Sequence, residues 1–524
     1  MAMLLVLGLE SCTDWLTTKP DSEIVLDDYW RNEAQAQAVL TACYRGFTVN
    51  TDKGENTVID RLIVWGELRS DNIISGLGSP LLRSDMVEIM KVNIKPSNKY
   101  CDWGSMYSII NNCNTFLYYA PGVLKSDANF TEGKLHSMEA EALTIRALCY
   151  FYLVRTFKEV PYITTPSIDD TQDYNVPKST EREVLDHIIA DLQTAQKSAR
   201  FDFGTTADNK GRVTLSTVNT ILADVYLWDQ QYANCVAMCD LVLMDPNLEL
   251  VPGTATGNMF MNVFYRGNST ESIFELQFDE QTQKNYSAMY LYGTSYMPLG
   301  ELSCPLFLVK GDYSPFDYKV GSNLESEIDK DSRYKDFIDQ NFGKINGVYP
   351  IFKYAGVVRT EDQQKNSSYS RRYDTSKWIM YRLADVMLME AEALVAPENP
   401  SDLDMQRAMY LVNKTYMRSN PTASPLDISA YASKADIEKL VLRERQRELM
   451  FEGKRWFDLM RVARRYNSPA SILTYVSPKL LGNVLGYTKM SVMNALYFPI
   501  PQGDIDNNKN LIQNPFYDET TSSN

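Results

Sequence analysis

Residues 219–247, NTILADVYLWDQQYANCVAMCDLVLMDPN, have the pattern of two short helices joined by a tight turn. The first helix is rich in small and apolar residues, and the turn falls at residues 229–232. A second apolar helix follows and ends at Asp245-Pro246, because proline cannot continue a helix. The stretch therefore predicts one antiparallel helical hairpin.

The same hairpin pattern recurs along the chain. LADVYL at residues 222–227 returns as LADVML at residues 383–388, again ahead of a second helix. In length, and in small residues such as Ala223, the unit is close to a tetratricopeptide (TPR) repeat, a helix pair of about 34 residues. Two further pairs join residues 33–47 to 105–119 and residues 139–157 to 181–198. We predict helix pairs near residues 33–119, 139–198, 215–247 and 378–417.

Long insertions separate these pairs. Residues 48–104, 248–376 and 464–495 are rich in Gly, Asn, Ser, Tyr and Pro, and SIFELQF at residues 272–278 indicates a strand. Long insertions on a rigid scaffold often carry function, so residues 48–104 and 248–376 are the expected ligand-binding parts. The predicted fold class is mainly α, a TPR-like helical-hairpin scaffold of four helix pairs with long irregular insertions containing a few short strands. Residues 24–524 are expected to form a single body.

Composition restricts the function classes. The 524 residues include 52 Lys+Arg and 67 Asp+Glu, a formal charge of −15, with no run of basic residues. Nucleic acid is an improbable partner, because its phosphates require clustered positive charge. Apolar residues make up 44% of the chain, enough for a large core. Cysteines beyond Cys12 show no C-x-x-C spacing and fall among apolar residues, which predicts buried thiols.

The N-terminus indicates a lipoprotein signal. The apolar run at residues 3–9 is too short to span a bilayer, and it leads into Leu9-Glu10-Ser11-Cys12, which resembles a bacterial lipobox. Residues 1–11 are then the signal peptide, Cys12 is the lipidated residue, and residues 12–23 form a linker from the outer-membrane lipid to the folded body. Glu10 and the absence of Lys or Arg before Leu4 depart from the usual pattern. The alternative is a cytosolic protein with a chance cysteine.

The reacting groups of common enzymes are missing. The chain has no G-x-S-x-G, P-loop, G-x-G-x-x-G or H-E-x-x-H motif, and its only histidines are His136 and His187. We therefore predict a protein that is not an enzyme and has no cofactor, no catalytic residue and no metal site. A pair of carboxylates for glycoside hydrolysis stays open, since it depends on their separation in space.

The C-terminal residues 436–524 hold the longest motifs. Residues 443–459 are RERQRELMFEGKRWFDL, followed by FPIPQ at residues 498–502 and NLIQNP at residues 510–515. Near the other end, residues 103–111 are WGSMYSIIN. In these motifs, and in their order, the chain resembles the SusD/RagB family of surface lipoproteins from Bacteroidota.

The resemblance implies a fold and a role. Such proteins have a TPR-like scaffold of four helix pairs with an irregular ligand-binding half, and they sit as a lid on a SusC-like TonB-dependent outer-membrane transporter. Most bind oligosaccharides, some bind peptides, and the fold is not known for catalysis. Ligand contacts in the family lie in the variable insertions, so the resemblance assigns no ligand residue by position.

The residues themselves suggest three candidate ligand-binding groups. Tyrosine presents a flat apolar face with a polar edge, which suits sugar rings. Tyr290 and Tyr292 would share one side of an extended chain, with Tyr296 nearby; the alternative is that they pack the insertion onto the scaffold. The other two groups combine flat and hydrogen-bonding side chains: Trp65, Asp71, Asn72 and Arg83 in the first insertion, and Arg372 and Tyr373 in the second. For the first-insertion group the alternative is a structural role, since GELRSD at residues 66–71 resembles a segment of the family.

Taken together, the sequence predicts a lipid-anchored protein at the cell surface, on the outer membrane. It would capture an oligosaccharide and deliver it to a SusC-like TonB-dependent transporter. One alternative is a peptide-binding RagB-like lipoprotein with the same transporter role. The other is a cytosolic TPR adaptor.

Overall fold

Helices make up most of the computed structural model, which describes residues 29–49, 54–76, 83–167, 172–253, 259–279, 281–293, 299–309, 314–316, 331–338, 347–356, 375–431 and 433–518. The α-helices in the first half are α2 (Glu33–Thr48), α3 (Val58–Glu67), α4 (Ser84–Met90), α5 (Gly104–Val123), α6 (Glu132–Phe157), α7 (Glu181–Gln196), α8 (Thr206–Gly211), α9 (Leu215–Trp228) and α10 (Tyr232–Leu243). Those in the second half are α11 (Tyr286–Tyr292), α12 (Leu306–Val309), α13 (Ser332–Phe337), α15 (Leu383–Val395), α16 (Asp402–Ser419), α17 (Lys434–Leu449), α18 (Arg455–Arg465), α19 (Ala470–Val476), α20 (Val484–Met490) and α21 (Gln502–Asn507).

The strands and the remaining helical turns are short. The strands are β1 (Ile74–Ser75), β2 (Ser272–Leu276), β3 (Leu302–Pro305), β4 (Val348–Tyr349) and β5 (Trp378–Arg382). The tighter or wider turns are η2 (Lys99–Cys101), η3 (Phe260–Arg266), η5 (Ile428–Ala430) and η6 (Met493–Leu496). The strand predicted in residues 272–278 is confirmed as β2.

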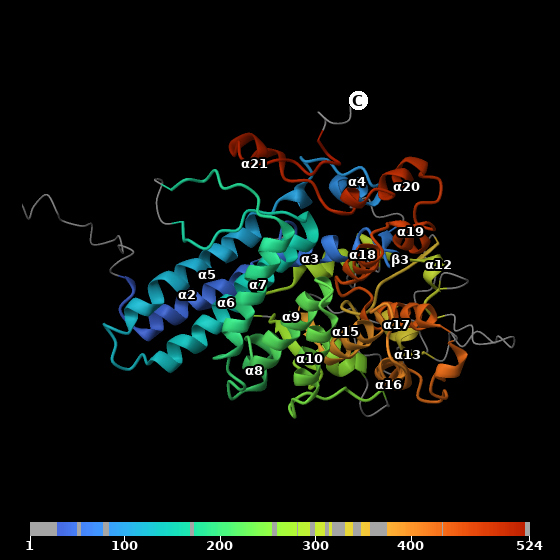
Figure 1. Ribbon diagram of the computed structural model, residues 1–524, viewed down its shortest axis with the longest axis horizontal. Coiled ribbons are helices and arrows are strands. Elements are labelled where there is room, and N and C mark those ends of the chain that lie inside the picture. The colour runs from blue at the N-terminus through green and yellow to red at the C-terminus, as the bar shows by residue number, and fades with distance from the viewer. Residues whose placement is uncertain are drawn as a thin grey trace, which may run out of the picture.

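Four helix pairs form the scaffold, as predicted. They are α2 with α5, α6 with α7, α9 with α10, and α15 with α16. Neighbouring pairs also touch, through α5 with α6, α7 with α9, and α10 with α15. The pairs therefore form one continuous array, which Figure 1 shows running from α2 and α5 toward α15 and α16.

Local signals start these helices. Each pair contains one helix that begins with a capping box, in which the side chain of the residue before the helix and that of its third residue each accept a backbone N–H. The capping residues are Asn32, Thr180, Thr214 and Ser401. The first four backbone N–H groups of a helix have no acceptor within the helix. A capping side chain accepts a hydrogen bond from one of them, and this favours a helix start at that residue.

The core runs along the centre of the array. Helix α9 is buried from Ser216 to Trp228, and α15 is buried over nearly its whole length. Both carry apolar residues all round, as expected of helices enclosed by other elements. Cys43, Cys101, Cys113, Cys149, Cys235, Cys239 and Cys304 are free and buried, as predicted.

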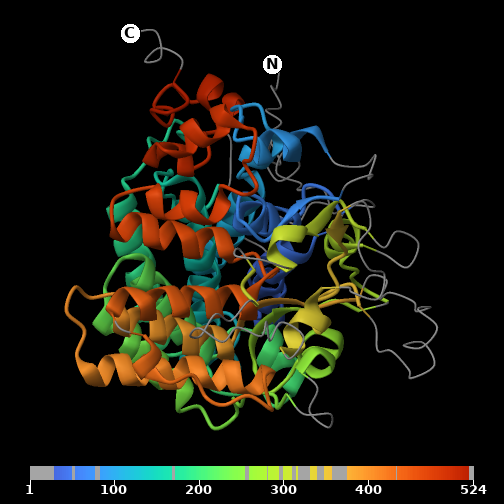
Figure 2. The same cartoon turned by 90° about the vertical axis from the view of Figure 1, so that its right-hand side faces the viewer.

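The two insertions predicted to bind ligand, residues 48–104 and 248–376, lie together on one side of the scaffold. Strand β1 of the first insertion pairs antiparallel with β3 of the second, with Ile74 opposite Ser303. Figure 2 shows the blue first insertion beside the yellow second one. A separate two-stranded sheet of β2 and β5 anchors the second insertion at the start of α15. No helix among the described residues is long and apolar enough to cross a bilayer.

Candidate ligand-binding site

Three of the candidate residues in the first insertion are enclosed by protein. Trp65 is 0% exposed, and its indole N–H donates to the Tyr100 carbonyl oxygen at 2.8 Å. Asp71 accepts two hydrogen bonds from Arg455, at 2.8 and 3.0 Å. The Gln446 amide donates to both Asp71 and Asn72. In this structure, these three side chains hold the insertion to the scaffold and present no surface to a ligand.

Asp71, which pairs with Arg455 on α18, lies next to a larger set of buried charges on α17. The charged run at residues 443–448, which an exposed helix could also carry, lies largely inside the protein. Burial alone would raise the pKa of Glu448, but Arg418, Arg382 and Arg333 hold it well below its usual range. The family-like motif is thus a structural ion network in which each buried charge needs its partners.

Arg83 brings the two insertions together. Its guanidinium donates to Asp60 at 2.8 and 3.0 Å and to the Tyr100 hydroxyl at 2.6 Å. It also pairs with Glu301, which comes from the second insertion, at 3.1 Å. Burial raises the pKa of Glu301 to about 7, although the positive charge of Arg83 acts to lower it. Arg83 is therefore engaged with protein partners, none of which the sequence indicated.

Tyr290 and Tyr292 differ from the prediction. They lie in helix α11, where residues two apart do not face the same side, so the predicted extended arrangement is wrong. Tyr292 is 0% exposed, donates its hydroxyl to the Phe451 carbonyl oxygen at 2.9 Å and stacks near Tyr354. Tyr290 is partly exposed, and its carbonyl oxygen accepts the Glu301 N–H at 3.1 Å.

Arg83, Glu301 and Tyr290 form what we call the insertion junction. The Arg83–Glu301 ion pair and the Gly76 N–H, which donates to the Glu301 carbonyl oxygen at 3.0 Å, join the two insertions, and Tyr290 is the partly exposed aromatic residue next to Glu301. Tyr296, Arg372, Tyr373 and Cys12, the predicted lipidation residue, lie outside the described residues.

A cleft at the start of α5 is a feature that the sequence did not single out. It has a volume of about 360 Å³ and is lined by Trp103 and by Tyr174, which is 58% exposed. Asp102 and Asp504 face it, and burial together with the charge of Asp102 raises the pKa of Asp504. Trp103 belongs to the WGSMYSIIN motif. No signal in the sequence indicated that it would line a cleft together with Asp504.

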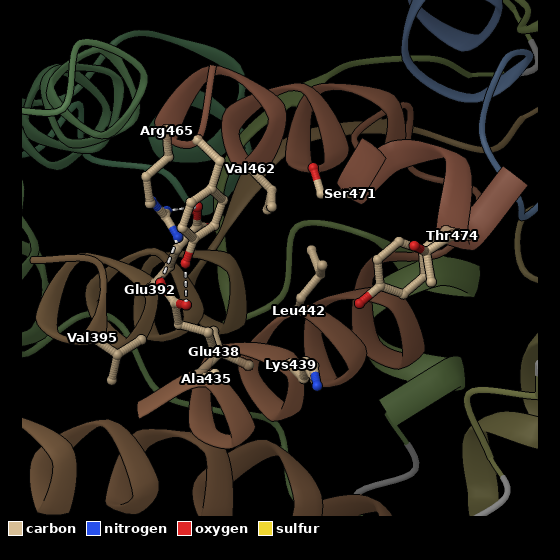
Figure 3. A pocket seen from close by; sticks show the side chains of 13 residues that line it. Glu392, Val395, Ala435, Glu438, Lys439, Leu442, Val462, Arg465, Ser471 and Thr474 are labelled. Carbon is tan, nitrogen blue, oxygen red and sulfur yellow. Dashed lines mark hydrogen bonds and ion pairs between the residues drawn. The ribbon is translucent and has the colours of Figure 1, made fainter. Parts of the chain in front are cut away.

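A more apolar cavity of about 210 Å³ lies between α15, α17, α18 and α19 (Figure 3). Its walls include Val395, Leu442 and Val462. The carboxylates of Glu392 and Glu438 are paired with Arg465, at 2.9 and 3.0 Å. Both carboxylates are therefore held in ion pairs with one arginine that joins α15, α17 and α18.

Comparison with known proteins agrees with this architecture. Residues 332–517 match the family model described as "SusD family", and residues 14–227 match the one described as "Starch-binding associating with outer membrane". SusD-like proteins P38 and P2 of Formosa agariphila are 23% and 24% identical to this chain. The matches cover 98% of this chain and 96% of P38, and 88% of this chain and 89% of P2.

A solved SusD homologue from Bacteroides thetaiotaomicron has the same fold. It superposes with a TM-score of 0.70 at 20% identity, covering 94% of this chain and all of that one. Fold and site together define a class of protein: a TPR-like helical scaffold whose insertions meet on one side. Within that class, the chain belongs to the SusD family.

Proposed function

We propose that this protein is a cell-surface glycan-binding lipoprotein that delivers oligosaccharide to a SusC-like TonB-dependent transporter. The observation that carries the proposal is the insertion junction, where both insertions of a SusD-type scaffold meet beside a partly exposed tyrosine. The description of the matching family as starch-binding and associated with the outer membrane supports the same ligand class.

Binding without catalysis fits the described geometry. An aromatic face with a few hydrogen-bonding groups can hold a sugar ring, and delivery requires that the ring is released again. We therefore expect weak affinity, on the order of micromolar to millimolar. Cys12 would anchor the chain in the outer membrane. A peptide ligand with the same transporter role is the alternative.

The test uses a glycan array and one substitution at the junction. The soluble form that begins after Cys12 should bind at least one oligosaccharide. Tyr290→Ala should weaken that binding about fivefold or more, because stacking on the ring is lost. Tyr410→Ala is the matched control, since Tyr410 lies on α16 and is 58% exposed. Tyr292 is unsuitable for this test because it is part of the core.

Two results would contradict the proposal. Equal binding by Tyr290→Ala and the Tyr410→Ala control would remove Tyr290 from the site. Absence of binding to every glycan, together with binding to extended peptides, would favour the peptide alternative.

A further inference from the structure

A third cavity opens where the second insertion leaves the scaffold. It has a volume of about 360 Å³ and lies between α8, the first turn of α9, residues 245–249 after α10, and residues 268–270 before β2. It shares no lining residue with the insertion junction. Figure 1 places α8 at the bottom of the molecule, while α4 of the first insertion lies at the top. We call it the α8 cavity.

Lys210 on α8 lines this cavity without a partner. The residue is only 7% exposed. Among the residues that the structure describes, none accepts a hydrogen bond from its ammonium group or forms an ion pair with it. Burial lowers the pKa of Lys210, while Glu275 and Asp245 act in the opposite direction from beyond ion-pair distance. The ammonium group is not one of the fully enclosed polar atoms that lack a partner, so it opens into the cavity, where a bound molecule can reach it.

Two other buried lysines show what a structural role looks like in this protein. Lys353 donates to two carbonyl oxygens and to Glu452, at 2.6 to 3.0 Å. Lys454 donates to the Met380 carbonyl oxygen and pairs with Asp385, both at 2.8 Å. Lys210 differs from both, which suggests that its acceptors come from a molecule bound in the cavity.

The surrounding charges restrict what that molecule is. Asp245 and Glu249 line the same cavity, so two carboxylates oppose one ammonium group. An anionic ligand would meet a net negative charge there. A neutral ligand with hydroxyl groups can instead accept from Lys210 and donate to Asp245, whose oxygens already accept from the Ser216 hydroxyl and the Asn247 N–H.

Phe201 adds a flat apolar face at the edge of the cavity. Its side chain is 49% exposed, which is unusual for phenylalanine, and it lines the α8 cavity beside Pro246 and Leu248. A pyranose ring has both matching features, a C–H face for the aromatic ring and hydroxyl groups for the polar wall. A volume of about 360 Å³ lies at the lower end of the range for small-molecule sites.

We propose that the α8 cavity binds one neutral pyranose unit, with Lys210 donating to its hydroxyl groups and Phe201 stacking on its ring. The inference rests on the proposed glycan-binding function and adds a second contact point to it, separate from the insertion junction. A longer glycan could then contact the protein at both places.

The test is saturation-transfer NMR on the full chain in a detergent without sugar groups. The probes are methyl α-glucopyranoside, methyl β-galactopyranoside, methyl α-mannopyranoside, galacturonate and inorganic phosphate. At least one neutral methyl glycoside should bind the wild type. Lys210→Met should bind it about tenfold more weakly, because a hydrogen bond from a charged group is lost. Phe201→Ala should weaken binding about fivefold, and Tyr290→Ala should leave it unchanged.

Thermal melting separates binding from folding. Lys210→Met should melt at the wild-type temperature or above it, since the substitution removes an unpaired buried charge. A melting temperature more than about 5 °C below wild type would mark Lys210 as a structural residue and overturn the inference.

Three binding results would also overturn it. They are unchanged affinity in Lys210→Met, tighter binding of galacturonate or phosphate than of any neutral glycoside, and no binding of any methyl glycoside by the wild type. The glycan array separates this failure from that of the proposed function. If wild type and Lys210→Met bind the array equally well, the α8 cavity is excluded while glycan binding stands.

Discussion

Glu392 shows how single residues stabilise the C-terminal part of this protein. It lies on α15, is 5% exposed, and pairs with Arg461 at 2.7 Å and with Arg465 at 2.9 Å. Burial would raise its pKa, but the two arginines, with Arg445 farther away, lower it to about 2 from 4.5. The shift makes the stability of the fold depend on pH.

Glu392→Gln should destabilise the protein most at neutral pH. A carboxyl whose pKa is depressed on folding stabilises the fold above its unfolded pKa, and that contribution is lost as the pH falls from about 4.5 toward 2. At pH 7 the charge of Glu392 contributes about 3 kcal/mol, and at pH 3.5 about 1 kcal/mol less.

Urea denaturation at pH 7 and pH 3.5 measures this difference. The gap in unfolding free energy between wild type and Glu392→Gln should narrow at the lower pH. Glu398→Gln, which removes the same charge from an exposed loop after α15, is the matched control. A gap that stays constant or widens on acidification would show that the two arginines do not hold Glu392 ionised.

At the scale of elements, one very close contact joins helix α3 to the turn after α17. A Cβ atom on Gly66 would lie 1.8 Å from the Gly453 carbonyl oxygen, so the two segments touch backbone to backbone. Gly453 has φ of 74°, a conformation that favours glycine, and its N–H donates to Glu67 at 3.1 Å. This contact ties the first insertion to the C-terminal motif.

Gly66→Ala should therefore push helix α3 away from the turn after α17. We expect a loss of about 3 kcal/mol or more in unfolding free energy, because the rigid backbone of the turn must move to admit a methyl group. Gly122→Ala on α5 is the control: no atom lies within 4 Å of its added Cβ, and alanine should be neutral or stabilise the helix by up to about 1 kcal/mol. Chemical denaturation of both variants checks this. Equal effects of the two substitutions would contradict the close contact.

Sequence patterns predicted the elements better than the site. The four helix pairs follow from local signals, namely apolar periodicity, small residues and capping boxes. The charges of α17 have no local signal of burial, because their partners Arg333, Arg382 and Arg418 come from distant parts of the chain. The same reason explains why Asp71 and Asn72 proved buried. Tyr290 and Tyr292 differ from the prediction for a local reason, because Asn285 caps a short helix that contains both.

At the scale of the whole molecule, one helical array carries two insertions that meet. The array is continuous from α2 to α16, so the insertions are held on a single body. Such a scaffold can present a ligand surface without moving, which suits capture and transfer of a ligand.

Membrane attachment is predicted to depend on one residue. In cells that process lipoproteins, the wild type should fractionate with the outer membrane, and Cys12→Ala should lose the acyl chain and leave that fraction. Mass spectrometry of the mature N-terminus, with immunoblotting of the fractions, measures both effects. Unchanged fractionation of the unacylated variant would contradict lipid anchoring through Cys12.

Whether this protein binds glycan without cleaving it can be measured by equilibrium dialysis against a mixture of oligosaccharides, followed by mass spectrometry of what the protein retains. At least one oligosaccharide should be enriched on the protein side and recovered at its original length. Retention of no oligosaccharide, or recovery of shortened products, would contradict a receptor that binds glycan without cleaving it.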